Sequence, residues 1–161
     1  MDAITMPLTP SLLGKLKHTY PSFTFVASHE FLWSPDTSTI HYNSADDQAD
    51  MLLLHELGHA LLGHSNYHRD IELLSMETAA WGEAEAIGTA ENITMQDDVI
   101  QDHLDSYRDW LHNRSICPEC GANGHQINVD HYQCIVCQTK WRVNEARTCQ
   151  LRRYQLKKNS R

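Results

Sequence analysis

His55, Glu56 and His59 lie within one short apolar stretch of the sequence, LLLHELGHALLGH. On a helix, His55 and His59 occupy positions i and i+4 and share one face, about one turn apart. Both can then bind one zinc ion, which accepts imidazole nitrogen at about 2.0–2.1 Å and in catalytic sites has three protein ligands and a water. Glu56 can take a proton from the metal-activated water that attacks a carbonyl group. The spacing predicts a catalytic zinc site with Glu56 as general base.

Apolar residues flank this motif at positions 51–54, 57 and 60–62. We expect such a helix to be buried almost all round, where two histidines and a glutamate are unfavourable unless they have partners. A metal ion would provide that partner. The flanks therefore favour a metal site over a chance HExxH match, which is the alternative for a motif this short.

A second predicted helix supplies the third zinc ligand. Glu77 lies in the middle of its apolar stripe, where an unpaired carboxylate would be strongly destabilising. Glu72 and Glu83 fall off that stripe. We predict Glu77 as the third ligand; the alternative is a surface glutamate that pairs with an arginine. The stripe has residues at 3-to-4 spacing: Leu73, Glu77, Ala80, Ala84 and Ile87. His64 and His68 are interpreted as loop histidines.

Four cysteines near the C-terminal end form two C-x2-C pairs separated by 13 residues: Cys117, Cys120, Cys134 and Cys137. Four thiolates make the closed tetrahedral site of a structural zinc, and Gly121 is placed for the turn of the first pair. Two disulfides would need an oxidising compartment, and iron is an alternative metal for four thiolates. Cys149 is left over as a free thiol. The spacing predicts a zinc ribbon.

The elements that must position these groups follow from apolar periodicity and turn residues. The sequence predicts a short helix over 8–18 that begins after Pro10, and strands within 22–43. The helix of the first motif should run from about Ser44 to Leu62 and end at Gly63. Asp70 is a plausible N-cap for the helix of Glu77, which should end near Ile87. A third helix should open at 94 or 97 and end near 112.

These elements predict an α+β fold, with an active-site helix packed on a short β-sheet, further helices and a zinc ribbon. We place a metallopeptidase domain at 1–113, the ribbon at 114–148 and a basic C-terminal tail at 149–161. Residues 1–113 hold 4 Lys and Arg against 18 Asp and Glu, whereas residues 114–161 hold 9 against 3. This asymmetry suggests two modules with different partners; the alternative is that both are simply solvated surface.

Neither a secretion signal nor an apolar run long enough to span a bilayer is visible in the sequence. We therefore expect a soluble, cytoplasmic protein of 161 residues with no membrane partner. The basic C-terminal module is a candidate for contact with nucleic acid or an acidic protein. Trp141 and Tyr154 could stack on bases, or Trp141 could fill the core of the ribbon.

The HExxH helix followed by Glu77-x-x-Ala80 resembles the ImmA/IrrE-type family of gluzincin metallopeptidases, over roughly residues 20–90. The resemblance implies limited proteolysis of a regulatory protein, often a helix-turn-helix repressor. It also implies that the strand TIHYN is the edge strand that aligns the peptide. The acidic segment QDDVIQDHLDSYRDWLH departs from the family pattern after the Glu77 helix.

Two other functions fit parts of the sequence. SprT-like proteases combine HExxH with a zinc ribbon and act on DNA-associated proteins, but they take a third histidine where this chain offers Glu77. A non-catalytic zinc-ribbon binding module is the other alternative, although a structural site has no use for the general base Glu56. The leading hypothesis is a zinc endopeptidase that cleaves a cytoplasmic protein.

Overall fold

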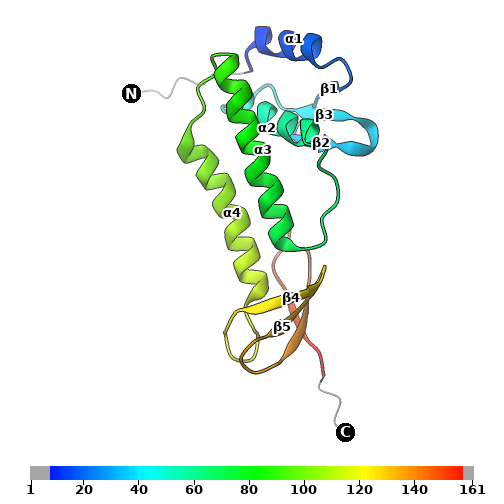
Figure 1. Cartoon of the computed structure of the whole chain (residues 1–161), viewed down its shortest axis with the longest axis vertical. Helices are drawn as coiled ribbons and strands as arrows, with labels where there is room; N and C mark the ends of the chain where they lie inside the picture. Colours follow the sequence, from blue (N-terminus) through cyan, green and yellow to red (C-terminus); the bar gives the residue numbers. More distant parts are fainter. Residues whose placement is uncertain (1–7, 158–161) are drawn as a thin grey trace. The chain divides into compact units, whose positions relative to one another are not determined.

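The computed structural model describes residues 8–157, which form four α-helices and two small β-sheets (Figure 1). This confirms the predicted α+β class. The chain divides into two compact units, one of Met1–Asn66 with Met76–Ile100 and one of Tyr67–Ser75 with Gln101–Arg161. The predicted domain boundaries at 113/114 and 148/149 stay a prediction. No helix within residues 8–157 is long and apolar enough to cross a membrane.

The sheet of the first unit has three strands in the order β1-β3-β2. β1 (Thr24–Ala27) is parallel to β3 (Thr39–Tyr42), and β2 (Leu32–Ser34) is antiparallel to β3. A 3-10 turn, η1 (Pro35–Thr37), joins β2 to β3. The expectation that TIHYN is an edge strand is wrong, because β3 lies in the middle. Its side chains alternate between half-buried and buried, which suits a strand with neighbours on both sides.

Helix α1 (Pro10–Thr19) begins at the proline itself, where the sequence predicted a start just after it, and buries Leu12 and Leu16. Helix α2 (Ala49–Leu61) carries the HExxH motif and packs on β2 and β3. It begins five residues later than predicted. The side chain of Asn43 accepts a hydrogen bond from the amide of Ala45, and Asp46 accepts one from Gln48. These local turns compete with helix and delay its start.

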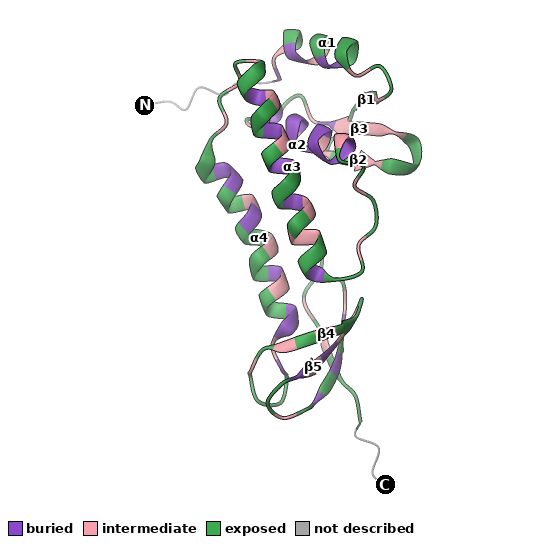
Figure 2. Ribbon diagram, in the orientation of Figure 1, coloured by how far each residue is buried: buried purple, intermediate pink, exposed green. Residues whose placement is uncertain are grey.

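Between residues 51 and 60 of α2, every side chain is buried except those of Leu52 and Glu56 (Figure 2). The helix ends at Leu61, and Gly63, the predicted stop, has a positive φ of 65°. The amide of Gly63 donates to the carbonyl of Ala60, and the amide of His64 donates to that of His59. These two bonds form a Schellman motif, which turns the chain back along the end of the helix.

Helices α3 (Asp70–Ala90) and α4 (Asp97–Ser115) each have residues in both units. Both were predicted, with their ends within three residues of the observed ones. In the first unit α3 buries Glu77, Ala80, Trp81 and Ala84, four of the positions on or beside the predicted stripe. The apolar periodicity therefore identified the buried face of this helix.

The second unit contains an antiparallel sheet in the order β4-β5-β6-β7. Its strands are β4 (Gly124–Asn128), β5 (His131–Cys134), β6 (Lys140–Val143) and β7 (Arg153–Gln155). β7 comes from the segment predicted to be a basic tail. Trp141 is 0% exposed, stacks on Tyr132 and donates from its indole to the carbonyl of Arg114. Of the two roles left open for Trp141, the structure supports the core role.

The buried carboxylate of Asp70 is hydrogen-bonded to three side chains of the second unit. Asp70 accepts hydrogen bonds from Nε of Arg114 at 2.7 Å and from the hydroxyl of Tyr132. The amide of Gln126 donates to its other oxygen at 3.1 Å. Arg114 also donates to three backbone carbonyls, so both charges are fully hydrogen-bonded. A buried ion pair is tolerated only under this condition.

Candidate metal centres

His55 and His59 of α2 and Glu77 of α3 bring three donor groups together in the first unit. Nε2 of His55 lies 3.0 Å from Oε2 of Glu77 and 3.1 Å from Nε2 of His59. Nε2 of His59 lies 3.4 Å from Oε1 of Glu77. The three residues are only 5%, 8% and 6% exposed, respectively. The structure thus brings the three predicted ligands together and leaves Glu72 and Glu83 outside the group.

These separations fit a tetrahedral zinc ion. With ligand bonds of about 2.0–2.1 Å, two donors at tetrahedral positions lie about 3.3 Å apart. The three observed separations, two of which are to different oxygens of Glu77, run from 3.0 to 3.4 Å and bracket that value. The donor types, two imidazole nitrogens and a carboxylate oxygen, are those that catalytic zinc sites use. The group therefore fits zinc in both chemistry and spacing.

The electrostatics of the group favour an ionised Glu77. Burial raises the pKa of Glu77, but hydrogen bonds and charges from His55 and His59 outweigh burial and lower this pKa to about 2. A carboxylate that stays ionised is ready to bind a cation at any physiological pH.

The two helices that carry the ligands approach each other closely at one glycine. A Cβ atom on Gly58 would lie 2.4 Å from the carbonyl oxygen of Ala80, closer than real atoms pack. Gly58 lies between the two histidines, and Ala80 is one turn beyond Glu77. One turn from the carboxylate, Trp81 stacks on the ring of His55 at 4.2 Å between centroids. The absent side chain at Gly58 thus allows the approach that places the three donors within reach.

Glu56 lies beside the donor group but is not part of it. Its Oε2 accepts a hydrogen bond from the backbone amide of Trp33 in β2 at 2.7 Å. Burial raises the pKa of Glu56 to about 7, although the charge of His59 and the Trp33 amide oppose the increase. A carboxyl group with this pKa can both accept and return a proton near neutral pH.

His64, interpreted from the sequence as a loop histidine, lies against a predicted ligand. Its Nδ1 is 2.9 Å from Nδ1 of His59, and its backbone carbonyl accepts a hydrogen bond from the indole of Trp33 at 2.8 Å. If Nε2 of His59 binds metal, its Nδ1 carries the proton and donates to His64. Burial and the charge of His59 lower the pKa of His64, which keeps it neutral and able to accept. The sequence signal for this role is the glycine stop immediately before His64, which turns the chain back.

The four cysteines of the two C-x2-C pairs form the second group. Sγ of Cys117 lies 3.6 Å from that of Cys137, and Sγ of Cys120 lies 3.5 Å from that of Cys134. Zinc–sulfur bonds of about 2.3 Å would place thiolates about 3.8 Å apart, whereas a disulfide would bring them to about 2.05 Å. The group therefore fits a metal rather than disulfides.

The backbone around the cysteines also favours thiolates. The amides of Val136 and Cys137 donate to Sγ of Cys134, and that of Glu119 donates to Sγ of Cys117. Hydrogen bonds with Thr139 lower the pKa of Cys137 to about 6. Gly121 has φ of 76°, as the turn predicted at this position requires. Cys149 is an exposed free thiol outside the group.

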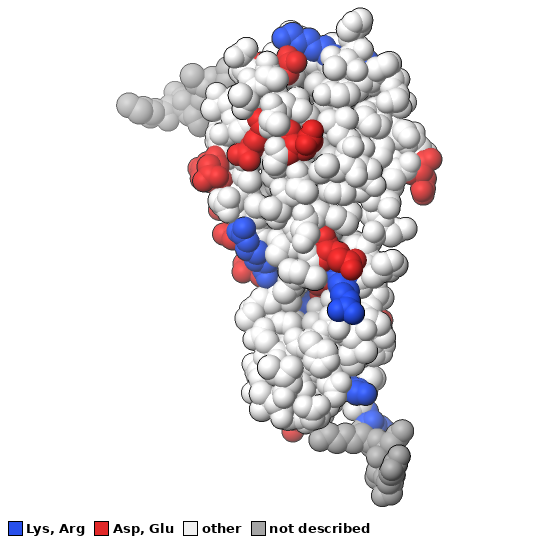
Figure 3. Space-filling view, viewed as in Figure 1, with Lys and Arg blue, Asp and Glu red and all other residues white. Residues whose placement is uncertain are grey.

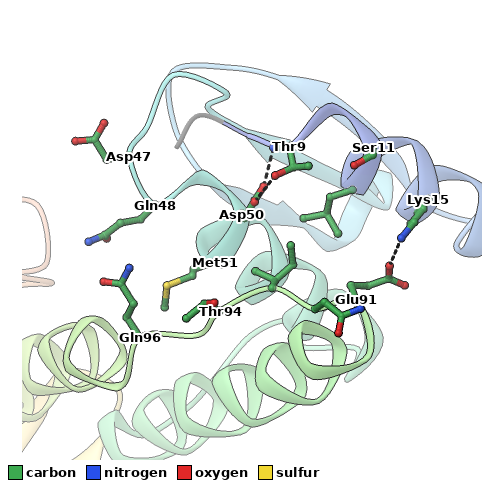
Figure 4. Close-up of a pocket in the computed structure, with 13 residues that line it drawn as sticks. Thr9, Ser11, Lys15, Asp47, Gln48, Asp50, Met51, Glu91, Thr94 and Gln96 are labelled. Carbon is green, nitrogen blue, oxygen red and sulfur yellow. Dashed lines mark hydrogen bonds and ion pairs between the residues drawn. The ribbon is translucent and has the colours of Figure 1, made fainter. Parts of the chain in front are cut away.

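A cavity of about 410 Å³ in the first unit lies away from the donor groups (Figure 4). Most of the residues that line it have polar side chains, and they come from α1, the start of α2, the residues just before each of these helices, and the segment that joins α3 to α4. Two contacts are drawn in Figure 4: Asp50 accepts from Thr9, and Lys15 pairs with Glu91. None of the predicted metal ligands lines this cavity, so we assign it no role in catalysis.

In comparisons with known proteins, no family model, curated protein or solved structure matches this chain. The resemblance to ImmA/IrrE-type enzymes therefore stays a prediction. What can be said of function depends on the geometry of the two donor groups.

Proposed function

We propose that the protein is a zinc-dependent endopeptidase of gluzincin type. The observation that carries the proposal is the position of Glu56. Its carboxylate adjoins a buried group of two histidines and a glutamate, and it is hydrogen-bonded to the amide of Trp33 in an edge strand. A site that served structure alone would have no need of a carboxyl group with a pKa near 7.

His55, His59 and Glu77 would hold the zinc ion through Nε2 of each ring and the carboxylate. A bound zinc ion would supply a Lewis acid that acidifies water and polarises the scissile carbonyl group. Glu56 takes the proton from the attacking water and delivers it to the amine that leaves. His64 keeps the ring of His59 in the orientation that points Nε2 into the group.

Strand β2 is the edge of the sheet on the side of Glu56. The amide of Trp33 donates to Glu56, and β2 has a neighbouring strand only on the side of β3. An extended peptide could add to this edge as a further strand through main-chain hydrogen bonds. Recognition through the main chain suits an enzyme that cleaves within a protein, so we propose a protein substrate.

The resemblance stated above adds a class of substrate to this proposal, namely a cytoplasmic DNA-binding regulator such as a helix-turn-helix repressor. The four-cysteine group would hold a second, structural zinc. Four thiolates fill all positions of a tetrahedral ion and leave none for water. We therefore assign catalysis to the first group alone.

The decisive experiment compares wild type with Glu56→Gln and His59→Ala. We expect two zinc ions per chain in wild type and in Glu56→Gln, and one in His59→Ala, by elemental analysis. Cleavage of unfolded casein, used as a generic protein probe, should be abolished in both variants. Glu83→Gln, which alters a carboxylate outside the group, is the matched control and should cleave as wild type does. Undiminished cleavage by Glu56→Gln would refute the mechanism.

The same measurement separates this proposal from a non-catalytic binding module. One zinc ion per chain in both wild type and His59→Ala would mean that only the cysteine group binds metal. The binding-module hypothesis would then replace the endopeptidase.

A further inference from the structure

One side of the second unit's sheet is exposed and basic. In β5 and β6, Tyr132, Cys134, Trp141 and Val143 alternate with the remaining residues and are buried. The alternate residues lie on the other side. Arg142 pairs with Tyr154 of β7, and Gln133 pairs with both Lys140 and His125. His131 pairs with Arg142 on the same side. We call this side the basic sheet face and define it by six residues: His125, His131, Gln133, Lys140, Arg142 and Tyr154.

Lys140 and Arg142 carry the positive charge of this face, whereas His131 pairs with the carboxylate of Asp130. Within residues 8–157, no ion pair involves Lys140 or Arg142. Other basic side chains of the unit are engaged elsewhere: Arg114 with Asp70, Arg147 over the ring of Tyr107, and Arg153 with the carbonyl of Asn113. Residues 114–161 contain only three acidic residues against nine basic ones. The positive charge of the face is therefore available to a ligand.

Tyr154 gives the face an aromatic platform. Its side chain is 42% exposed, and the guanidinium of Arg142 lies 4.7 Å from the centre of its ring. A planar cation over an exposed ring forms one continuous stacking surface. In Figure 3 the described residues next to the C-terminal trace show basic side chains.

We propose that the basic sheet face binds single-stranded nucleic acid. Single strands are bound by surfaces that combine cations for the phosphates with aromatic rings on which bases stack. The face offers two cations outside ion pairs, in consecutive outward positions of β6, and the exposed ring over which Arg142 lies. An acidic peptide would satisfy the cations but would make no use of the exposed Tyr154 ring. This inference stands on the second unit alone and does not depend on the proposed peptidase activity.

The test is fluorescence anisotropy of the zinc-loaded full chain with a labelled oligothymidine of about 20 nucleotides, between about 50 and 200 mM salt. Each phosphate contact on a single strand contributes about 0.7 to the slope of log K against log salt. The double variant Lys140→Gln/Arg142→Gln should reduce that slope by about 1.4. Tyr154→Leu should weaken binding about tenfold at one salt concentration and leave the slope unchanged.

The matched control is Lys15→Gln/Lys17→Gln, which removes the same charge from α1 and should bind as wild type does. Zinc content, measured on every variant, reports whether the cysteine group stays assembled. Absence of binding at 50 mM salt would overturn the proposal. So would a salt slope that the control variant changes and that Lys140→Gln/Arg142→Gln leaves unchanged. So would stronger competition by polyglutamate than by unlabelled oligothymidine, because the face would then be a site for acidic protein.

Discussion

The close approach of α2 and α3 at Gly58 makes the first donor group sensitive to a single methyl group. In Gly58→Ala the new Cβ would lie 2.4 Å from the carbonyl oxygen of Ala80, whereas ordinary contacts begin at 3.4 Å. Both partners are rigid, since one is a buried helix backbone and the other is the methyl group itself. The helices must therefore separate by about 1 Å at this point.

That displacement is large compared with the tolerance of a metal site. Donor distances must be correct to within about 0.2 Å, and His55, His59 and Glu77 depend on the same helix pair as Gly58. We expect zinc affinity at the first group to fall at least tenfold, the size of effect that even indirect changes around a zinc site produce. Overpacking should also lower the free energy of unfolding by about 1–3 kcal/mol.

The assay is competition for zinc with a chromogenic chelator, together with urea unfolding. Gly82→Ala is the matched control, because a Cβ at Gly82 meets nothing within 4 Å and alanine stabilises a helix by about 1 kcal/mol relative to glycine. The control should retain both zinc ions and gain stability. If Gly58→Ala also keeps both zinc ions at wild-type affinity, the helix contact does not set the ligand geometry, and this reasoning is wrong.

Three further predictions concern hydrogen bonds and protons in the two units. His64→Ala should weaken zinc binding at the first group by about 10–100-fold, measured by chelator competition, whereas His68→Ala in the exposed loop should have no effect. Arg114→Met leaves the buried carboxylate of Asp70 without its charged partner and should cost the second unit about 3–5 kcal/mol in urea unfolding; a loss below 1 kcal/mol would contradict the ion-pair argument. Because burial raises the pKa of Glu56 to about 7 in the metal-free site, this carboxyl is protonated at pH 6 and ionised above pH 8. At pH 6, zinc binding should therefore release up to about one more proton from wild type than from Glu56→Gln, and at pH 8.5 the two proteins should release the same number. Calorimetry in buffers of different ionisation enthalpy measures this proton release.

The sequence predicted most of the first donor group because helical geometry constrains it. A spacing of four residues places His55 and His59 on one face, and the apolar stripe around Glu77 indicates which carboxylate is buried. The cysteine group was predictable for a related reason, since each C-x2-C pair is a local turn that needs no long-range information.

Features that depend on contacts between distant segments were not predictable. In the order β1-β3-β2, both outer strands pair with β3, and β1 does so in parallel. The sequences of three short strands do not specify which strand lies in the middle. Gly58 could have drawn attention as a glycine inside a buried helix, where it is unfavourable unless a backbone comes close. Which backbone comes close is a property of the fold. The ring of His64 reaches His59 only because the helix end reverses the chain there.

The two donor groups differ in their number of donors and in the acid that lies beside the first. The cysteine group has four donors, so a metal bound there would have no coordination position left for water. None of these four side chains has a pKa raised to near 7. The first group has three donors, which would leave one position for water, and Glu56 adjoins it while Trp33 holds its carboxylate in place. Glu56 and Leu52 are the residues between 51 and 60 of α2 that remain partly exposed, which would give a substrate access to the carboxylate. The number of donors and the placement of this one acid therefore favour catalysis at the first group and structure at the second.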